Sequence, residues 1–389
     1  MLNLTSGQGG RKLRKVLFVH DLVFKQDKQG AVFGGSGLDE KYFDRFFCSK
    51  YDEVTILSRV QNIRGSEKER FKNKNIKVTN IMGKNYLSIL NPIFYFRLMK
   101  YIKQSNLVVI SIPSVTGAVV ALFCNVFLKP YAVEVAGDGD AFLTKKGGRI
   151  FSIYLNFMMP FYIKNAQGAA YVTKYLAAKF PNEKKNLVSS NVNIEDIHTR
   201  LNLSKSLCEK DQVKIGFVGG LNKRKGVDTL IRSAQQLIVE KGYTNLFFCL
   251  VGAHADFDIE NLLSKCNIKE YFFLHGLKSK KDVFRLMQTF DLYVQPSLSE
   301  GLPRATIEAM SFGLPVVATQ LPGFEEILEK EDLVRPGDVK AFVIAIETLL
   351  LSKDIFNKKS CKNLAVSSSF LYEKLHKKRC KYYRSFTKD

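Results

Sequence analysis

Residues 291–319 read DLYVQPSLSEGLPRATIEAMSFGLPVVAT, a stretch in which two short apolar runs flank a helical segment. The runs DLYVQPS and PVVAT have the composition of buried strands. Residues 304–312 have that of a helix, with Pro303 suited to its first turn. Continuous apolar strands that alternate with helices are typical of a parallel sheet covered on both faces. This stretch therefore predicts an α/β fold.

The same alternation extends in both directions along the 389 residues. Apolar runs such as KVLFVH, LVVISI and YAVEV alternate with amphipathic segments in the first half, and VKIGFVG, LFFCLVG and YFFLHG do so in the second. A polar stretch over residues 191–212 separates the two series, and a chain of this length favours two domains. We therefore predict two Rossmann-like domains facing each other across a cleft, over residues 1–200 and 201–352. Residues 353–389 are predicted to form a basic C-terminal helix.

The formal net charge of +22 is unevenly distributed. Residues 1–200 contain 30 Lys and Arg against 15 Asp and Glu, residues 201–350 contain 18 against 19, and residues 351–389 contain 11 against 3. Such a basic excess suits nucleic acid, an anionic membrane surface or phosphorylated small molecules. Because the sequence contains no zinc-knuckle, basic-zipper or RNP-like run, we expect no nucleic-acid partner.

Cysteine usage and the N-terminus favour a cytoplasmic protein. The seven cysteines are scattered and never adopt a Cys-x2-Cys spacing, which is typical of reduced thiols. The N-terminus lacks the apolar core of a signal peptide. The longest apolar stretch, residues 107–128, is interrupted by Pro113 and Gly117, so we predict a buried strand and a core helix rather than a membrane span. Peripheral attachment to the inner face of the cell membrane stays open.

Glu300 and Glu308 flank the loop and helix start of the opening stretch, with seven residues between them. A helix that begins near Pro303 would aim its free N–H groups and positive dipole end at an anion such as a diphosphate. A carboxylate accepts two or more hydrogen bonds, which suits it to the vicinal hydroxyls of a sugar or ribose. The alternative is that Glu300 caps the helix and Glu308 is a solvated surface charge.

A second motif, KIGFVGGLNKRKGVDTLIRSAQQL, spans residues 214–237 and combines a strand, a glycine turn, a basic loop and an amphipathic helix. Gly219 and Gly220 permit close backbone approach to a ligand, and Lys225 is placed to neutralise a departing diphosphate. The alternative is a solvated basic loop before a helix. Neither a Walker motif nor a complete Gly-x-Gly-x-x-Gly is present.

Together these motifs resemble those of retaining glycosyltransferase family 4, which has the GT-B fold. The matching residues, in order, are Pro296, Ser297, Glu300, Gly301, Glu308, Ala309, Met310, Gly313, Pro315, Val316, Val317 and Ala318. The resemblance implies that Glu300, with Gly301 and Leu302, contacts the donor sugar and that Glu308 binds the nucleotide ribose. It assigns Lys225 to the leaving phosphates. The family's arginine position is occupied by Gly220, so a second cation would have to come from Lys223 or Arg224, or is absent.

Three further loops match the family pattern by position. Two strand-end loops that approach the nucleotide base contain Gly252, His275, Gly276 and Leu277. A glycine loop near the acceptor and the donor phosphates contains Gly34, Gly35, Ser36 and Gly37. In the loop after YAVEV, many family members have a histidine where this chain has Gly137. Asp138, which we take as a catalytic candidate, and Asp140 are the polar groups available there, unless they merely cap the next helix.

The resemblance implies a retaining transfer of sugar from a UDP- or GDP-linked donor, a co-substrate, to a glycan bound by the N-terminal domain. We expect no cofactor and no metal ion, since no Asp-x-Asp stands in a metal-binding context. The expected acceptor is lipid-linked, in cell-surface polysaccharide or lipopolysaccharide biosynthesis. Residues 85–103 and 145–164 mix aromatic, aliphatic and basic side chains and would either dock on an anionic membrane or face the core. In the family the C-terminal helix packs back on the N-terminal domain; a solvated tail is the alternative. A non-catalytic protein that binds a sugar nucleotide or polysaccharide is the alternative function.

Overall fold

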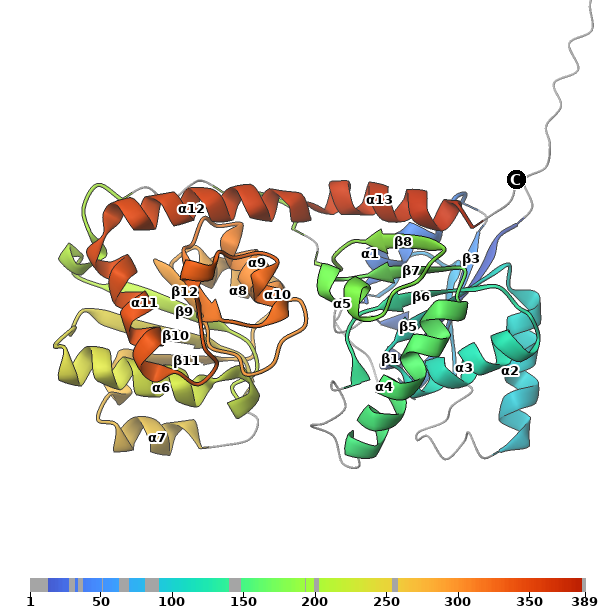
Figure 1. The fold of residues 1–389 in the computed structure, drawn as a ribbon, viewed down its shortest axis with the longest axis horizontal. Coiled ribbons are helices and arrows are strands. Elements are labelled where there is room, and N and C mark those ends of the chain that lie inside the picture. Colours follow the sequence, from blue (N-terminus) through green and yellow to red (C-terminus); the bar gives the residue numbers. More distant parts are fainter. Residues whose placement is uncertain are drawn as a thin grey trace, which may run out of the picture. The chain divides into compact units, whose positions relative to one another are not determined.

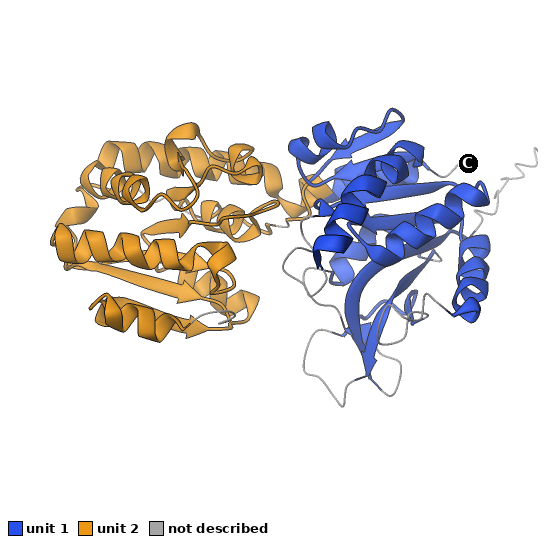
Figure 2. Ribbon diagram, turned by 60° about the horizontal axis from the view of Figure 1, so that its bottom comes forward, with its two compact units in different colours: residues 1–189, 376–389 blue, residues 190–375 orange. Residues whose placement is uncertain are grey.

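The computed structural model describes residues 13–27, 32–33, 38–50, 52–62, 70–80, 91–139, 148–192, 194–198, 203–253 and 258–386. The chain divides into two compact units (Figure 2). Unit 1 comprises Met1–Ser189 and His376–Asp389, and unit 2 comprises Ser190–Leu375. The division therefore falls before the polar stretch rather than at position 200. The backbone N–H of Ile194 donates to Phe370 and its carbonyl accepts from Tyr372, and this pairing holds the segment after Ser189 in unit 2.

Unit 1 contains one sheet, whose described strands are β1 (Lys15–Gln26), β2 (Val32–Phe33), β3 (Glu53–Asn62), β4 (Ile76–Thr79), β5 (Leu107–Ile112), β6 (Tyr131–Val135), β7 (Gly168–Tyr171) and β8 (Lys185–Val188). Their order is β4-β3-β1-β5-β6-β7-β8, and β2 pairs antiparallel with β1. All strands of the main path pair in parallel. The order reverses between β1 and β5, as in a doubly wound Rossmann sheet.

Helices cover both faces of this sheet (Figure 1). One face packs against α2 (Pro92–Gln104), α3 (Val115–Val126), α4 (Gly148–Asn165) and α5 (Lys174–Lys179). The other packs against α1 (Glu40–Phe43), η1 (Asp44–Phe46) and the end of α13 (Tyr372–Arg384). Residues 107–128 form β5 and α3, which confirms the strand and core helix predicted for this stretch. In the described part of the chain, every helix is too short or too polar to cross a membrane.

Unit 2 has the same plan. Its described strands are β9 (Val213–Val218), β10 (Leu246–Val251), β11 (Phe272–Gly276), β12 (Leu292–Gln295), β13 (Val316–Thr319) and β14 (Leu333–Val334), in the order β11-β10-β9-β12-β13-β14. All of these pairs are parallel. Strands β9, β10, β12 and β13 are apolar and mostly buried, which explains why their sequences read as continuous hydrophobic runs. Both units thus have the Rossmann strand order, and the α/β prediction is confirmed.

The helical elements of unit 2 surround its sheet. They are η4 (Leu207–Glu209), η5 (Lys223–Lys225), α6 (Val227–Gln235), η6 (Gln236–Glu240), α7 (Ile259–Lys265), η7 (Lys269–Tyr271), α8 (Lys280–Met287), α9 (Arg304–Met310), α10 (Pro322–Glu325), η8 (Lys330–Asp332), α11 (Val339–Leu351), α12 (Lys353–Ser367) and η9 (Ser368–Phe370).

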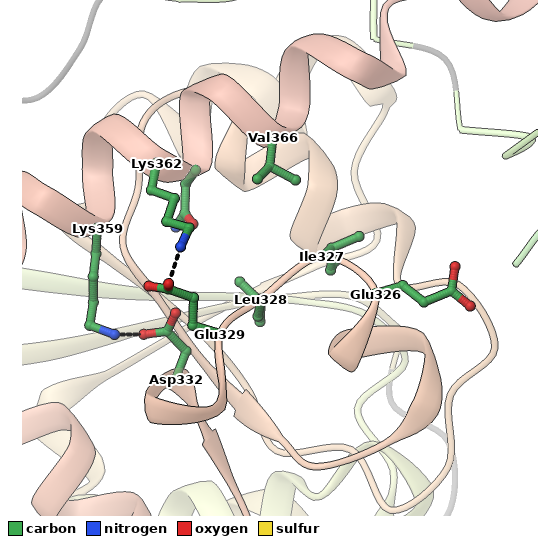
Figure 3. A pocket seen from close by; sticks show the side chains of 9 residues that line it. Glu326, Ile327, Leu328, Glu329, Asp332, Lys359, Lys362 and Val366 are labelled. Atoms are coloured by element: carbon green, nitrogen blue, oxygen red, sulfur yellow. Dashed lines mark hydrogen bonds and ion pairs between the residues drawn. The ribbon is translucent and has the colours of Figure 1, made fainter. Parts of the chain in front are cut away.

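The C-terminal segment forms two helices rather than one; α12 belongs to unit 2, and the division between the units falls within α13, after Leu375. Helix α12 lies in unit 2, where Lys359 pairs with Asp332 and Lys362 with Glu329 (Figure 3). These pairs cross a pocket of about 260 Å³ lined also by Leu328. Because both of its lysines are already paired with carboxylates, we assign this pocket a structural role in attaching α12.

The end of α13 packs within unit 1 around Glu134 of β6. Arg45 donates to the Glu134 carboxylate at 3.2 Å, and Tyr42 and Tyr383 also donate to it. Arg14 donates to the backbone carbonyl of Tyr383 at 2.8 Å. A buried carboxylate is tolerated where several donors surround it. Glu134 is therefore structural, the role that its place within a strand suggests.

Candidate active site

The candidate site lies in unit 2, where the carboxyl ends of β9 and β12 are neighbours. The chain runs from β9 outward to β10 and β11 and then returns to the other side of β9 as β12. In open parallel sheets, ligands bind beyond the carboxyl ends of the strands at such a reversal. Two loops leave the sheet here, one through η5 to α6 and one over residues 296–303 to α9.

The two loops are joined by three successive contacts. The backbone N–H of Leu298 donates to the carbonyl of Arg224 at 2.8 Å, and Arg224 Nη1 donates to the carbonyl of Ser299 at 3.1 Å. The Lys225 ammonium then forms an ion pair with Glu300 Oε2. The Lys225 and Glu300 side chains are only 15% and 12% exposed. The structure thus places the two motif residues side by side, although they are 75 positions apart in the sequence.

Gly226 permits this close approach. Its φ of +70° lies in the left-handed region, and a Cβ at this position would come within 1.8 Å of the Pro296 carbonyl oxygen. Asn222 prepares the turn, because its side chain accepts a hydrogen bond from the backbone N–H of Lys225 at 3.0 Å. Helix α6 begins after Gly226 without a side-chain cap. Sequence reasoning noted neither residue, although a glycine directly before a helix is a visible signal.

Backbone hydrogen bonds join the loops after β9, β10 and β11. Gly219 donates to Val251 at 2.9 Å, and Gly252 donates to Gly276 at 3.0 Å. A Cβ on Gly252 would come within 1.7 Å of the Gly219 carbonyl oxygen, so glycine is required there. The structure therefore brings three of the predicted donor-binding glycines to one edge of the sheet. Gly220 lies beside them, and a Cβ on it would meet the Asn222 side chain at 2.9 Å.

Gly323 of α10 lies directly against loop 296–303. A Cβ on Gly323 would lie within 1.6 Å of the Gly301 carbonyl oxygen, so this glycine fixes the path of the loop. Gly301 is exposed, and Leu302 is half-buried. The next helix, α9, begins at Arg304 without a side-chain cap. Gly323 was not anticipated, because its contact joins segments that are apart in sequence.

Glu308 lies in the second turn of α9, close to the sheet. Burial raises the pKa of its carboxyl above the usual 4.5, although the charges of Lys280 and Arg304 oppose this shift. Glu308 is therefore not the solvated surface charge of the alternative interpretation. Burial is the main cause that raises the pKa of the Tyr293 phenol, and the negative charges of Glu308 and Glu300 raise it further. The two glutamates thus lie near the same buried tyrosine.

Hydrogen bonds among buried polar residues at the strand ends support the site. The Tyr293 hydroxyl donates to Gln295 Oε1 at 2.7 Å, and Gln295 Nε2 donates to Ser297 Oγ at 3.2 Å. Thr319 Oγ1 donates to the Ser297 carbonyl at 2.5 Å. These side chains lie at the carboxyl ends of β12 and β13, directly before the Glu300 loop. Their alternation along the strands was visible in the sequence, but their mutual contacts were not.

His275 and Leu277 occupy the loop after β11. His275 Nε2 is buried and makes no hydrogen bond to any described residue. Burial lowers the pKa of His275, with further lowering by the charges of Lys278 and Lys214, so the neutral imidazole is favoured. Leu277 is 80% exposed. These positions are compatible with contact to a flat base, which stays a prediction.

The remaining predicted residues belong to unit 1. Asp138 follows β6, and its carboxylate pairs with Lys179 of α5 at 2.7 Å. The side chain is therefore engaged within its own unit, and its catalytic role stays a prediction. Gly137 is described and has open space around its Cα, with Pro113 as the nearest group at 3.7 Å. Gly34, Gly35, Ser36, Gly37 and Asp140 lie outside the described residues.

The corresponding reversal point of unit 1 is closed by its own side chains. The Asp21 carboxylate of β1 accepts hydrogen bonds from the backbone N–H groups of Val115 and Thr116 at 2.6 and 3.1 Å. Ser114 Oγ accepts from the backbone N–H of Gly117 at 2.8 Å. The first turn of α3 is thus fully capped by protein atoms, in contrast to the uncapped starts of α6 and α9.

Two Rossmann-like units in one chain are the architecture of the GT-B class of fold. A family model for glycosyl transferases group 1 matches residues 181–365. Protein CapJ of Staphylococcus aureus is 31% identical over 349 residues, which cover 87% of each sequence. The chain therefore belongs to the group 1 glycosyl transferases.

More distant relatives match parts of the chain. The capsular polysaccharide biosynthesis glycosyltransferase CapM of Staphylococcus aureus is 30% identical over 36% of the chain and 37% of its own length. The UDP-Gal:alpha-D-GlcNAc-diphosphoundecaprenol alpha-1,3-galactosyltransferase of Escherichia coli is 26% identical over 41% of the chain and 43% of its own length. The chain thus spans less than half of these two proteins.

Solved structures share the fold at low sequence identity. Sucrose-phosphate synthase from Thermosynechococcus elongatus has a TM-score of 0.72 at 13% identity, over 96% of this chain and 98% of that one. HepE of Anabaena, solved with UDP and glucose, has a TM-score of 0.67 at 16% identity, over 96% and 100% of the two chains. These likenesses support the fold across both units.

Proposed function

We propose that this glycosyltransferase moves a sugar from a UDP- or GDP-linked donor to a glycan acceptor, with retention of the anomeric configuration. The observation that supports the proposal most is the Lys225–Glu300 pair at the reversal point of unit 2. The pair offers a cation for the leaving diphosphate beside a carboxylate for the sugar hydroxyls. Both groups are largely buried, where electrostatic interactions are stronger than in water.

Each part of the donor would have its own set of groups. Lys225 and the uncapped start of α6 would stabilise the negative charge that develops on the diphosphate. Glu308 would accept hydrogen bonds from the ribose, and the loops at Gly252 and Gly276 would approach the base. Because Lys225 would neutralise charge on the leaving diphosphate, we propose that transfer needs no divalent metal ion. Excess EDTA should therefore leave the rate of sugar transfer unchanged.

We further propose that the acceptor is lipid-linked and serves cell-surface polysaccharide or lipopolysaccharide biosynthesis. The name of the Escherichia coli relative specifies a diphosphoundecaprenol-linked sugar, and that of CapM specifies capsular polysaccharide. The acceptor would bind unit 1, with Asp138 as the candidate group that orients it. The more basic composition of residues 1–200 supports a phosphate-bearing acceptor.

The test is turnover of a panel of UDP- and GDP-sugars with lipid-linked glycan acceptors, comparing the wild type with Glu300→Gln. We expect Glu300→Gln to lower transfer by about 100-fold or more, because it removes a charge-assisted contact to the donor. Glu347→Gln is the matched control, because Glu347 pairs with Lys241 at 2.7 Å beyond the opposite end of α6. The product's anomeric configuration is read by NMR. Donor binding without transfer in the wild type would instead indicate a non-catalytic protein.

A further inference from the structure

Exposed apolar side chains concentrate on one helical layer of unit 1. Of the 22 large apolar side chains that are exposed among the described residues, 11 belong to α2, to α4 or to α3 and the two residues after it. Helices α2, α3 and α4 are neighbours on the same face of the sheet (Figure 1). In unit 2, by contrast, the exposed apolar side chains are spread over the strands, loops and helices.

Helix α4 is apolar on two opposite sides. Its inner side buries Leu155, Met159 and Tyr162 against the sheet. Its outer side carries an exposed stripe at helical spacing: Ile150, Ile153, Tyr154, Phe157 and Phe161. Phe157, in the middle of the stripe, is 79% exposed. A helix that is apolar on both sides is expected to be covered on both.

Helix α2 adds an apolar hollow with a basic rim. Tyr95, Phe96, Met99 and Phe127 line a hollow of about 610 Å³ between α2 and the end of α3, and Lys100 and Lys103 complete its wall. Phe96 is 81% exposed. The exposed outer side of α2 thus changes from apolar near its start to basic toward its end, where Arg97, Lys100 and Lys103 lie.

Acidic side chains are nearly absent from this region of the sequence. Residues 70–182 contain 15 Lys and Arg but only three acids, Glu134, Asp138 and Asp140. Glu134 is buried against Arg45, and Asp138 pairs with Lys179. Helices α2, α3 and α4 contain no acidic residue at all. Aromatic and aliphatic side chains beside basic ones are the combination that binds the headgroup region of an anionic bilayer.

We propose that the outer face of α2 and α4 docks unit 1 on a bilayer that contains anionic phospholipid. Phe96 and Phe157 insert at the level of the acyl chains, while Arg97, Lys100 and Lys103 contact the headgroup phosphates. The charge complementarity and the apolar stripe on the outer side of α4 support a lipid surface over an acidic protein partner. This docking goes beyond sugar transfer, since it depends on neither the donor nor the acceptor.

The test is co-sedimentation of the full chain with phosphatidylcholine vesicles, with and without phosphatidylglycerol. The wild type should bind only the vesicles with phosphatidylglycerol, and added salt should weaken the binding. Phe96→Glu with Phe157→Glu should lower binding by about tenfold or more. Lys100→Gln with Lys103→Gln should lower it by about tenfold, and these exposed lysines can be replaced without disturbing the core. Ile344→Glu is the control, because Ile344 is 61% exposed on α11 of unit 2.

Three outcomes would overturn the docking proposal. The first is absence of binding to anionic vesicles at low salt, and the second is unchanged binding by both double variants. The third is a wild-type dimer in light scattering that Phe96→Glu and Phe157→Glu dissociate, which would assign the face to a second copy of the chain. Turnover of a water-soluble acceptor is measured in parallel, so that failure of docking is distinguished from failure of the proposed transfer.

Discussion

The two units have the same strand order at their reversal points but treat the adjoining helix starts in opposite ways. In unit 1, Asp21 and Ser114 occupy the first N–H groups of α3. In unit 2, α6 and α9 begin without side-chain caps, and Lys225 and Glu300 stand beside them. The difference teaches that the fold provides two equivalent places for an anion, and that the side chains close one and leave the other open.

The units also differ in charge. Unit 1 has a net charge of +21, from 35 basic and 14 acidic side chains, whereas unit 2 has +1, from 24 and 23. The open site therefore lies in the nearly neutral part of the chain, where a single lysine can define a local anion site. The strongly basic part has its reversal point closed, and its charge is available for an extended anionic surface.

Removing the cation of the open site should have the largest effect. Lys225→Ala is expected to lower turnover by about 100- to 1,000-fold, because the leaving diphosphate loses its charged partner. The measurement is steady-state transfer from the preferred nucleotide sugar. Lys241→Ala, which removes the ammonium that pairs with Glu347 beyond the far end of α6, is the control and should retain most activity. Equal losses in both variants would contradict a specific role for Lys225.

Moving the two loops of the open site apart should have the next largest effect. Gly226→Ala would place a Cβ 1.8 Å from the Pro296 carbonyl oxygen, so the loop with Lys225 must shift. Gly242→Ala is the matched control, because its φ of +77° is similar and its Cβ would have open space. Both should lose about 1–2 kcal/mol from the left-handed backbone. Only Gly226→Ala should lose more than this in thermal unfolding, and only it should weaken nucleotide binding.

Opening the closed site of unit 1 should affect stability alone. Asp21→Ala leaves the N–H groups of Val115 and Thr116 without their acceptor, at a cost of about 1–3 kcal/mol. The check is the free energy of unfolding together with UDP affinity, which should stay unchanged. Asp258→Ala removes an exposed cap of α7 and should cost less, about 1 kcal/mol. A large loss of UDP affinity in Asp21→Ala would break the distinction between the units.

The smallest effect concerns the protonation of Glu308. Because burial raises the pKa of this carboxyl above 4.5, protonation as the pH falls through the raised pKa removes a buried charge and favours folding. The same protonation removes an acceptor for the ribose, so nucleotide affinity should fall over this pH range. Glu308→Gln should bind more weakly at neutral pH and lack this step. Calorimetric titration with UDP across pH tests this, and an identical pH profile in both proteins would contradict it.

The sequence predicts the architecture well because a strand buried on both faces is a continuous apolar run, which can be recognised from a few neighbouring residues. Residues 107–128 were correctly separated into a strand and a core helix, because Pro113 and Gly117 interrupt the apolar stretch after the strand-like run LVVISI. The unit boundary was missed because the pairing of Ile194 with residues 370 and 372 joins segments that lie far apart in the chain. For the same reason, residues 353–389 were predicted as one helix, although ion pairs to Glu329 and Asp332 hold α12 in unit 2.

The candidate site shows the same limit. Lys225, Glu300 and Glu308 could be selected from local motifs, because glycine, proline and charged residues after a strand mark ligand loops. The ion pair between Lys225 and Glu300 could not, since it depends on β9 and β12 becoming neighbours. The same holds for Gly226 and Gly323, whose need for glycine comes from carbonyl groups of distant segments. The pairing of Asp138 with Lys179 is likewise a long-range contact.

Amide hydrogen exchange with and without UDP or GDP tests most directly whether the anion site of unit 2 is open and that of unit 1 is closed. One nucleotide should increase protection in residues 219–226 and 297–302 of unit 2 and leave residues 115–118 of unit 1 unchanged. Protection confined to residues 115–118, or no change in unit 2 with either nucleotide, would contradict the account.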